Sequence, residues 1–174
     1  MDRIIRTPNQ IKEKIEGWLF RHEQKGKDQF NGDEVFTLVS KLSPTGLQQL
    51  NDKLRLHKFE IPVLILLTGT DSFIVNTTER FIHISGADIE AINYTDFDCH
   101  LGFVSILEKQ NPNRTAVKGI KTEGSFQEFG IKSKFGTTTY WTVPTGKPGF
   151  SFWNVTNKCE IIGRRFLLTK QPIH

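Results

Sequence analysis

The sequence is poor in cysteine and contains no long apolar run. Cys99 and Cys159 are the two cysteines among 174 residues, too few for a structural zinc site or a disulfide framework. The longest apolar stretch, IPVLILL at 61–67, is too short to span a bilayer. The opening segment MDRIIRTPNQ also lacks the apolar core of a signal peptide. These absences favour a cytoplasmic protein with reduced thiols.

Blocks of like charge are missing as well. The formal net charge is +4, and lysines and arginines are scattered among the acids. The aromatic residues are mainly phenylalanine, with 14 Phe against 3 Trp and 2 Tyr. Phenylalanine has no polar atom that needs a partner, so this balance favours core filling over base stacking. The composition therefore disfavours a nucleic-acid partner.

The first third of the chain follows a helical pattern. The segment TPNQ at 7–10 has the form of a helix start, with a Thr cap, Pro at the first helical position and Gln at the third. Apolar spacing at 35–42 predicts a second helix, and Ser43-Pro44 begins a third. We expect residues 1–60 to form a helical segment packed on a β domain at 61–174.

After Pro62 the apolar pattern changes to that of strands. Turn residues separate the stretches at close intervals, and no helical pattern lies between them. This arrangement predicts an α+β fold with an antiparallel sheet of about seven strands that curls into a barrel or sandwich. The expected strands are VLILL, SFIVN, FIHIS, IEAINY and the stretches 103–107, 115–121, 126–133 and 137–143.

A single amphipathic helix is expected near the end of the chain. Its apolar stripe is spaced by three, four, three and four residues. We expect this face to cover the open end of the curled sheet. The stripe consists of Phe152, Val155, Cys159, Ile162 and Phe166.

The order of these elements resembles the pleckstrin-homology-like (PH-like) fold, in particular the small bacterial PH-like domains. The stretch SFIVNTTERFIHIS is similar to a hairpin of those domains, in which a polar turn, here with Thr77, Thr78 and Arg80, leads into an apolar strand. IEAINY stands where their next strand would be, and the predicted terminal helix stands where theirs caps the barrel. The resemblance covers roughly residues 60–168.

The resemblance implies a binding function. PH-like domains in general bind phosphoinositides or peptides, or serve as assembly modules. The lipid-binding type places basic residues in the loop between its first two strands. Here that loop is Gly69-Thr70-Asp71, which carries an acid and no Lys or Arg. This departure argues against an inositol phosphate at that loop.

Basic residues elsewhere offer an alternative site for an anion or a lipid headgroup. Gly146-Lys147 lacks the upstream Gly and the following Ser or Thr of a P-loop, so no nucleotide is expected there. A turn before a helix N-terminus can still attract an anion through its free N–H groups. The candidate ligand-binding residues are Lys132, Lys134, Lys147 and Arg164.

One short segment crowds several metal-ligand types together. If the segment is extended, Asp96, Asp98 and His100 project from one face in a geometry that a divalent metal could use. Strands also commonly expose polar residues to solvent, and no second cluster supplies the remaining ligands. A metal-dependent hydrolase at these residues is therefore the third alternative.

Nucleophilic catalysis has little support. Cys99 and His100 are sequence neighbours, and neighbours on a strand point to opposite faces rather than forming a dyad. Cys159 lies on the apolar stripe, which is typical of a buried, inert thiol. We therefore expect a non-catalytic protein-interaction or assembly module without a cofactor. Its partner would be a protein, with anionic lipid as the alternative and a homo-oligomer left open.

Overall fold

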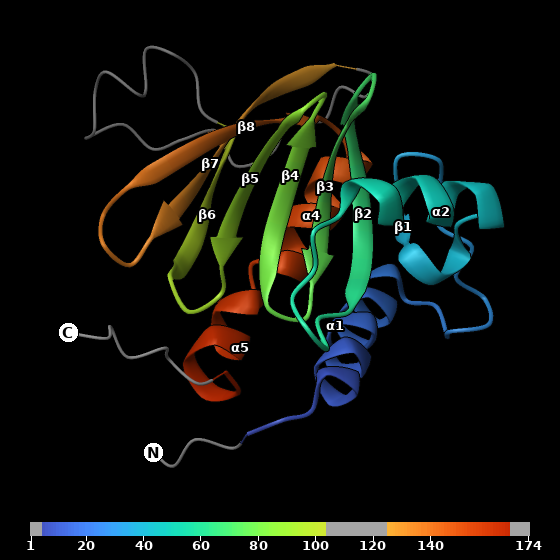
Figure 1. Cartoon of the computed structure of the whole chain (residues 1–174), viewed down its shortest axis with the longest axis horizontal. Helices are drawn as coiled ribbons and strands as arrows, with labels where there is room; N and C mark the ends of the chain where they lie inside the picture. Colours follow the sequence, from blue (N-terminus) through green and yellow to red (C-terminus); the bar gives the residue numbers. More distant parts are fainter. Residues whose placement is uncertain (1–4, 104–124, 168–174) are drawn as a thin grey trace.

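The computed structural model describes residues 5–103 and 125–167 and has an α+β fold with two antiparallel sheets (Figure 1). Sheet A has five strands in the order β1-β2-β3-β4-β5, and sheet B has three in the order β6-β7-β8. The strands are β1 (Phe36–Leu38), β2 (Pro62–Gly69), β3 (Ser72–Thr77), β4 (Arg80–Ser85), β5 (Asp88–Asn93), β6 (Phe97–Phe103), β7 (Phe126–Ser133) and β8 (Thr138–Pro144). The helices are α1 (Pro8–Glu23), the 3-10 helix η1 (Val39–Lys41), α2 (Pro44–Lys53), α4 (Lys147–Thr156) and α5 (Cys159–Arg165).

The α+β class and the antiparallel strand pairing predicted from the sequence are confirmed. Closure into a barrel is not observed, because β5 and β6 follow each other in the chain yet belong to different sheets. The expected strand at 115–121 lies outside the described residues. Most of the expected strand at 103–107 lies outside them too, and β6 ends at Phe103.

Helix α1 begins as its sequence predicts. The Thr7 hydroxyl accepts a hydrogen bond from the Gln10 backbone N–H, and the Gln10 side chain accepts one from the Thr7 N–H. This reciprocal capping satisfies two of the N–H groups that a helix start leaves without partners. No helix in the described part of the chain has the length and apolarity needed to cross a membrane.

The helix predicted at 35–42 is wrong. Phe36–Leu38 instead forms β1, which pairs with Leu64–Leu66 at the edge of sheet A, and the 3-10 helix η1 follows it. Phe36 and Leu38 are both buried in the core. Tertiary pairing with β2 therefore overrides a local spacing that fits a helix equally well.

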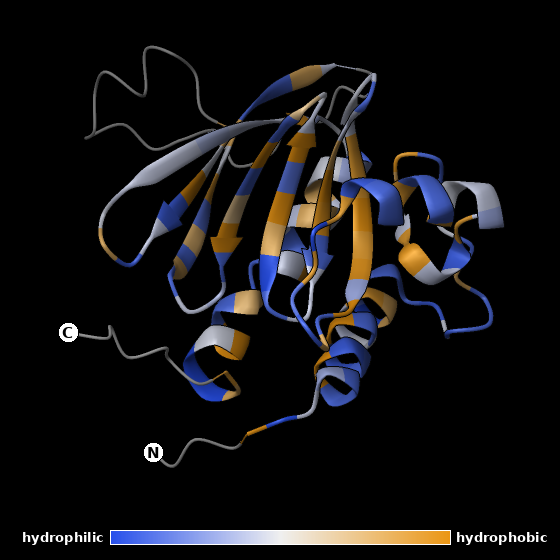
Figure 2. Cartoon of the chain, viewed as in Figure 1, coloured by the Kyte–Doolittle hydropathy of each residue, from blue (hydrophilic) through white to orange (hydrophobic). Residues whose placement is uncertain are grey.

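Sheet A separates two apolar layers. Its inner face packs against sheet B, α1, α4 and α5, and buries aromatic side chains such as Phe81, Phe129 and Phe152. Its outer face carries Val75 and Ile82 and is covered by α2. Figure 2 shows the hydrophobic colour concentrated along β2, β3 and β4, the central strands of sheet A.

The terminal helical stripe is confirmed in its burial and corrected in its shape. All five stripe residues are buried. The helix is not continuous, because it divides into α4 and α5 at Asn157-Lys158. The Asn157 side-chain oxygen accepts the backbone N–H of His100 at 2.8 Å, which fixes this junction against β6.

Candidate functional site

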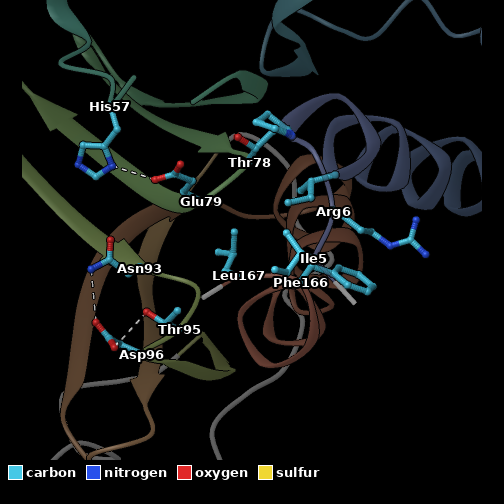
Figure 3. Close-up of a pocket in the computed structure, with 12 residues that line it drawn as sticks. Ile5, Arg6, His57, Thr78, Glu79, Asn93, Thr95, Asp96, Phe166 and Leu167 are labelled. Carbon is cyan, nitrogen blue, oxygen red and sulfur yellow. Dashed lines mark hydrogen bonds and ion pairs between the residues drawn. The ribbon is translucent and has the colours of Figure 1, made fainter. Parts of the chain in front are cut away.

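A pocket of about 600 Å³ lies at the end of sheet A where β3 turns into β4 (Figure 3). Elements from both ends of the chain meet there, because α1, the β3–β4 turn, the β5–β6 turn and the end of α5 all contribute. The lining residues are Ile5, Arg6, Pro8, Ile11, His57, Thr78, Glu79, Asn93, Thr95, Asp96, Phe166 and Leu167.

One wall of the pocket is polar. His57 Nδ1 lies 2.9 Å from a Glu79 carboxylate oxygen. Asn93 donates its amide to Asp96 at 3.4 Å, and the Thr95 hydroxyl donates to the same carboxylate at 3.3 Å. Figure 3 shows these two groups side by side along the wall. The wall therefore presents two carboxylates, one beside the His57 imidazole and one beside the Asn93 amide and the Thr95 hydroxyl.

The opposite wall is apolar. Ile11 and Phe166 are buried, and Ile5 and Leu167 lie beside them at the pocket. The Arg6 guanidinium carbon lies 4.7 Å from the Phe166 ring centroid, a cation–π contact. Figure 3 shows its guanidinium directed away from the carboxylate wall. The pocket thus has one acidic side and one hydrocarbon side.

The turn that carries Glu79 is held by a buried ion pair. Both carboxylate oxygens of Glu60 accept from Arg80, each at 3.0 Å, and the Thr77 hydroxyl donates to Glu60 at 2.6 Å. Burial alone would raise the pKa of Glu60, but these donors and the His57 backbone N–H together lower it. Removing one member would leave an uncompensated buried charge. The intact network therefore stabilises the turn that carries Glu79.

A second possible metal group appears beside the pocket. Ligand atoms of His57, Glu60 and Glu79 all lie within 4.8 Å of one another. The two Glu60 oxygens already accept four hydrogen bonds, two of them from Arg80. A cation would have to displace that guanidinium, so the geometry favours the ion pair over a metal.

The structure does not bring Asp96, Asp98 and His100 together. Register shifts on both sides of Cys99 and His100 break the alternation of β6. Asp98 therefore lies at the surface, 3.4 Å from the Lys132 ammonium, whereas His100 is 6% exposed. Bulges of this kind shift the side chains that follow to the other face of a strand.

His100 instead occupies a cage of aromatic rings from β4, β6, β7 and α4. Its ring centroid lies between 4.9 and 5.4 Å from those of Phe81, Phe97, Phe129 and Phe152. Its Nε2 lies 2.8 Å from the Thr156 hydroxyl, which itself donates to the Phe152 carbonyl at 2.6 Å. Nε2 must then carry the proton, and no residue that the structure describes pairs with the buried Nδ1.

The four basic candidates lie at three separate places. Lys132 pairs with Asp98, and the Lys134 ammonium donates to the Thr95 carbonyl at 2.9 Å, near the β7–β8 hairpin. Lys147 follows the opposite end of β8 and lies 3.3 Å from Glu23 of α1. Arg164 pairs with Glu160 within α5. These residues therefore do not form one anion site.

Both cysteine thiols have pKa values above the ordinary one. Burial raises the pKa of the Cys159 thiol to about 12. Burial also raises the pKa of Cys99, with a further contribution from Asp98. Because the thiolate is the nucleophile, both shifts disfavour reactivity. Burial similarly raises the pKa of Tyr94, whose hydroxyl donates to the Thr77 carbonyl beside the pocket at 2.8 Å.

The sequence contained only part of the signal for this pocket. The segment Thr77-Thr78-Glu79-Arg80 stood out as a polar turn, but nothing in the sequence linked it to His57 or to Phe166. Asp96 was singled out for a different role.

Comparison with known protein families, curated proteins and solved structures found no match to this chain.

Proposed function

We propose that this chain is a non-catalytic protein-interaction module of PH-like type, and that a segment of the partner docks at the pocket beside the β3–β4 turn. The PH-like part of the proposal rests on the resemblance in the sequence. It is supported by two runs of antiparallel strands, β2-β3-β4-β5 and β6-β7-β8, followed by the terminal helices α4 and α5.

The observation that carries the proposal is a set of exposed apolar side chains, one lining the pocket and two close in sequence to residues at it. Ile5, which lines it, is 69% exposed. Phe59 stands two residues after the lining residue His57 and is 72% exposed. Phe135 is 80% exposed. It follows Lys134, which donates hydrogen bonds to the backbone carbonyls of Thr95 and Asp96. Exposed large apolar side chains near a concave site are typical of a protein-contact surface.

The chemistry of the described residues favours binding over catalysis. The cysteine thiols are held in their neutral forms, and the aromatic cage removes His100 from solvent. The pocket wall offers carboxylates, amides and hydroxyls beside a hydrocarbon surface, which is a set suited to recognition.

The first prediction tests the docking site with a blocking substitution. Asn93 is exposed and lines the pocket, so Asn93→Trp should fill its mouth. The matched control is Ala91→Trp, because Ala91 is exposed on the same strand and does not line the pocket. We expect affinity capture from a lysate of the native cells to recover one partner with the wild type and with Ala91→Trp, and to lose it with Asn93→Trp.

Equal capture by both tryptophan variants would contradict the docking site. Melting temperatures of the three proteins show that a loss of capture does not come from unfolding. Light scattering of the purified chain identifies a second copy as the partner if the mass doubles. In that case Asn93→Trp should restore the monomer.

Anionic lipid is the second candidate ligand, and its candidate site is the tip of the β7–β8 hairpin. Lys132, Lys134 and the exposed Phe135 lie together there. We expect flotation with vesicles of phosphatidylserine and phosphatidylcholine to be negative, because Glu79 and Asp96 would repel such a surface. Salt-sensitive flotation lost with Lys134→Gln would favour the lipid instead.

A further inference from the structure

No lysine or arginine side chain in the described part of the chain pairs with Glu79 or Asp96, the two carboxylates of the pocket. Glu79 pairs with His57, and Asp96 accepts from Asn93 and Thr95. Some acids elsewhere have lysine partners: Asp71 pairs with Lys53, Asp98 with Lys132 and Glu23 with Lys147. The pocket wall therefore carries negative charge that the described lysines and arginines do not pair.

The described arginine and lysine that lie at or beside the pocket have other contacts. Arg6 lies over the Phe166 ring, and its guanidinium points away from the wall in Figure 3. The Lys134 ammonium donates to the Thr95 carbonyl, at the edge of the pocket. An additional cation inside the pocket would thus meet two carboxylates and the side-chain oxygens of the wall.

The apolar wall restricts what kind of cation fits. Ile11, Phe166 and Leu167 present a hydrocarbon surface opposite the acids. A lysine or arginine side chain has the matching two parts, an aliphatic stem and a charged head. A small inorganic cation would use the carboxylates and leave the hydrocarbon wall uncovered.

We propose that the pocket binds the side chain of an arginine or lysine in the partner's docking segment. The stem lies on Ile11 and Leu167, and the charged head donates hydrogen bonds to Glu79 and Asp96. The exposed Phe59 and Phe135 contact apolar residues that flank this side chain. This inference rests on the proposed function, because it names the chemistry of the partner at the same site.

The test is a nuclear magnetic resonance titration of the full chain with Nα-acetyl-arginine amide. Nα-acetyl-citrulline amide is the matched neutral probe, since its urea head has almost the same shape without the charge. We expect saturable shifts of the Thr78, Thr95 and Asp96 amide signals with the arginine probe. Affinity should be about tenfold weaker for citrulline, which corresponds to about 1.4 kcal/mol.

Substitutions separate the pocket charge from general electrostatics. The double variant Glu79→Gln, Asp96→Asn keeps the shape of the wall and should weaken arginine binding about tenfold. Asp88→Asn, an exposed acid on β5 that does not line the pocket, should leave binding unchanged. Lys134→Gln should not weaken it, since that substitution removes a competing cation. Inorganic phosphate should not shift the pocket signals.

Three outcomes would overturn the inference: equal affinity for the two probes, no effect of the double variant, or pocket shifts with phosphate. The proposed function has a separate failure. If Asn93→Trp abolishes partner capture while the double variant does not, the docking site stands and its cation specificity is wrong. If Asn93→Trp leaves capture intact, the docking site itself is wrong.

Discussion

Replacing Gly163 with alanine should destabilise the protein by about 3 kcal/mol, near the upper end of the usual cost of overpacking. Gly163 lies in α5 where the helix crosses the β5–β6 turn. An added Cβ would overlap the Tyr94 carbonyl group and lie 2.7 Å from the Thr95 nitrogen. Both obstacles are backbone atoms, so no side chain can rotate away. Helix α5 would have to move, which would expose Cys159 and Ile162.

Gly17→Ala is the matched control for this substitution. Gly17 lies within α1, and no heavy atom would come within 4 Å of its added Cβ. Alanine should therefore stabilise the protein by about 0.5–1 kcal/mol through its helix propensity. Urea unfolding monitored by circular dichroism measures both variants. A Gly163→Ala protein as stable as the wild type would show that α5 does not dock closely on this turn.

Acid should destabilise the fold strongly through His100. Burial lowers the pKa of this imidazole from its ordinary 6.5 to about 3. Between these two values the unfolded chain binds a proton that the folded chain does not. The stability due to neutral His100 is therefore complete above pH 6.5 and is lost as the pH falls. The loss is about 1.4 kcal/mol per pH unit.

His100→Phe isolates this contribution. A phenyl ring suits the aromatic cage, the Thr156 hydroxyl keeps its bond to the Phe152 carbonyl, and Asn157 still binds the backbone at position 100. We expect the variant to lose about 2–3 kcal/mol less than the wild type when urea unfolding is compared at pH 6.5 and pH 4.5. His83 and Glu60, whose pKa values are also lowered, titrate in both proteins and cancel.

Parallel pH dependence of the two proteins would contradict the assignment of His100 as the acid-sensitive group. The comparison also reports on the cage directly. A proton on Nδ1 would enter a site where none of the described residues offers that nitrogen an acceptor. Loss of near-ultraviolet circular dichroism from the surrounding aromatics should therefore accompany acid unfolding in the wild type.

Features governed by neighbouring residues could be predicted from the sequence. The cap of α1 depends on Thr7 and Gln10, three positions apart, and the buried stripe of the terminal helices depends on repeats of three and four. The strands β2 to β5 follow from branched residues between turns. Each of these signals is contained within a few residues.

Features set by distant contacts could not be predicted. The edge strand β1 forms because β2 offers a pairing edge, although its own spacing fits a helix. Bulges in β6 direct His100 into the core and leave Asp98 at the surface. Regular alternation along the strand would have placed both side chains on one face, as the sequence predicted. The pocket is lined by residues from Ile5 to Leu167, and no local sequence pattern predicts that these residues lie together.

The packing of α1 against α4 has a consequence for synthesis of the chain. The apolar face of α1, with Ile15 and Leu19, is synthesised more than a hundred residues before Phe152 and Val155, which share its core. Contacts between such distant segments close slowly. The apolar face of α1 in the nascent chain therefore stays uncovered until α4 has been made, and chaperones can bind it during that interval.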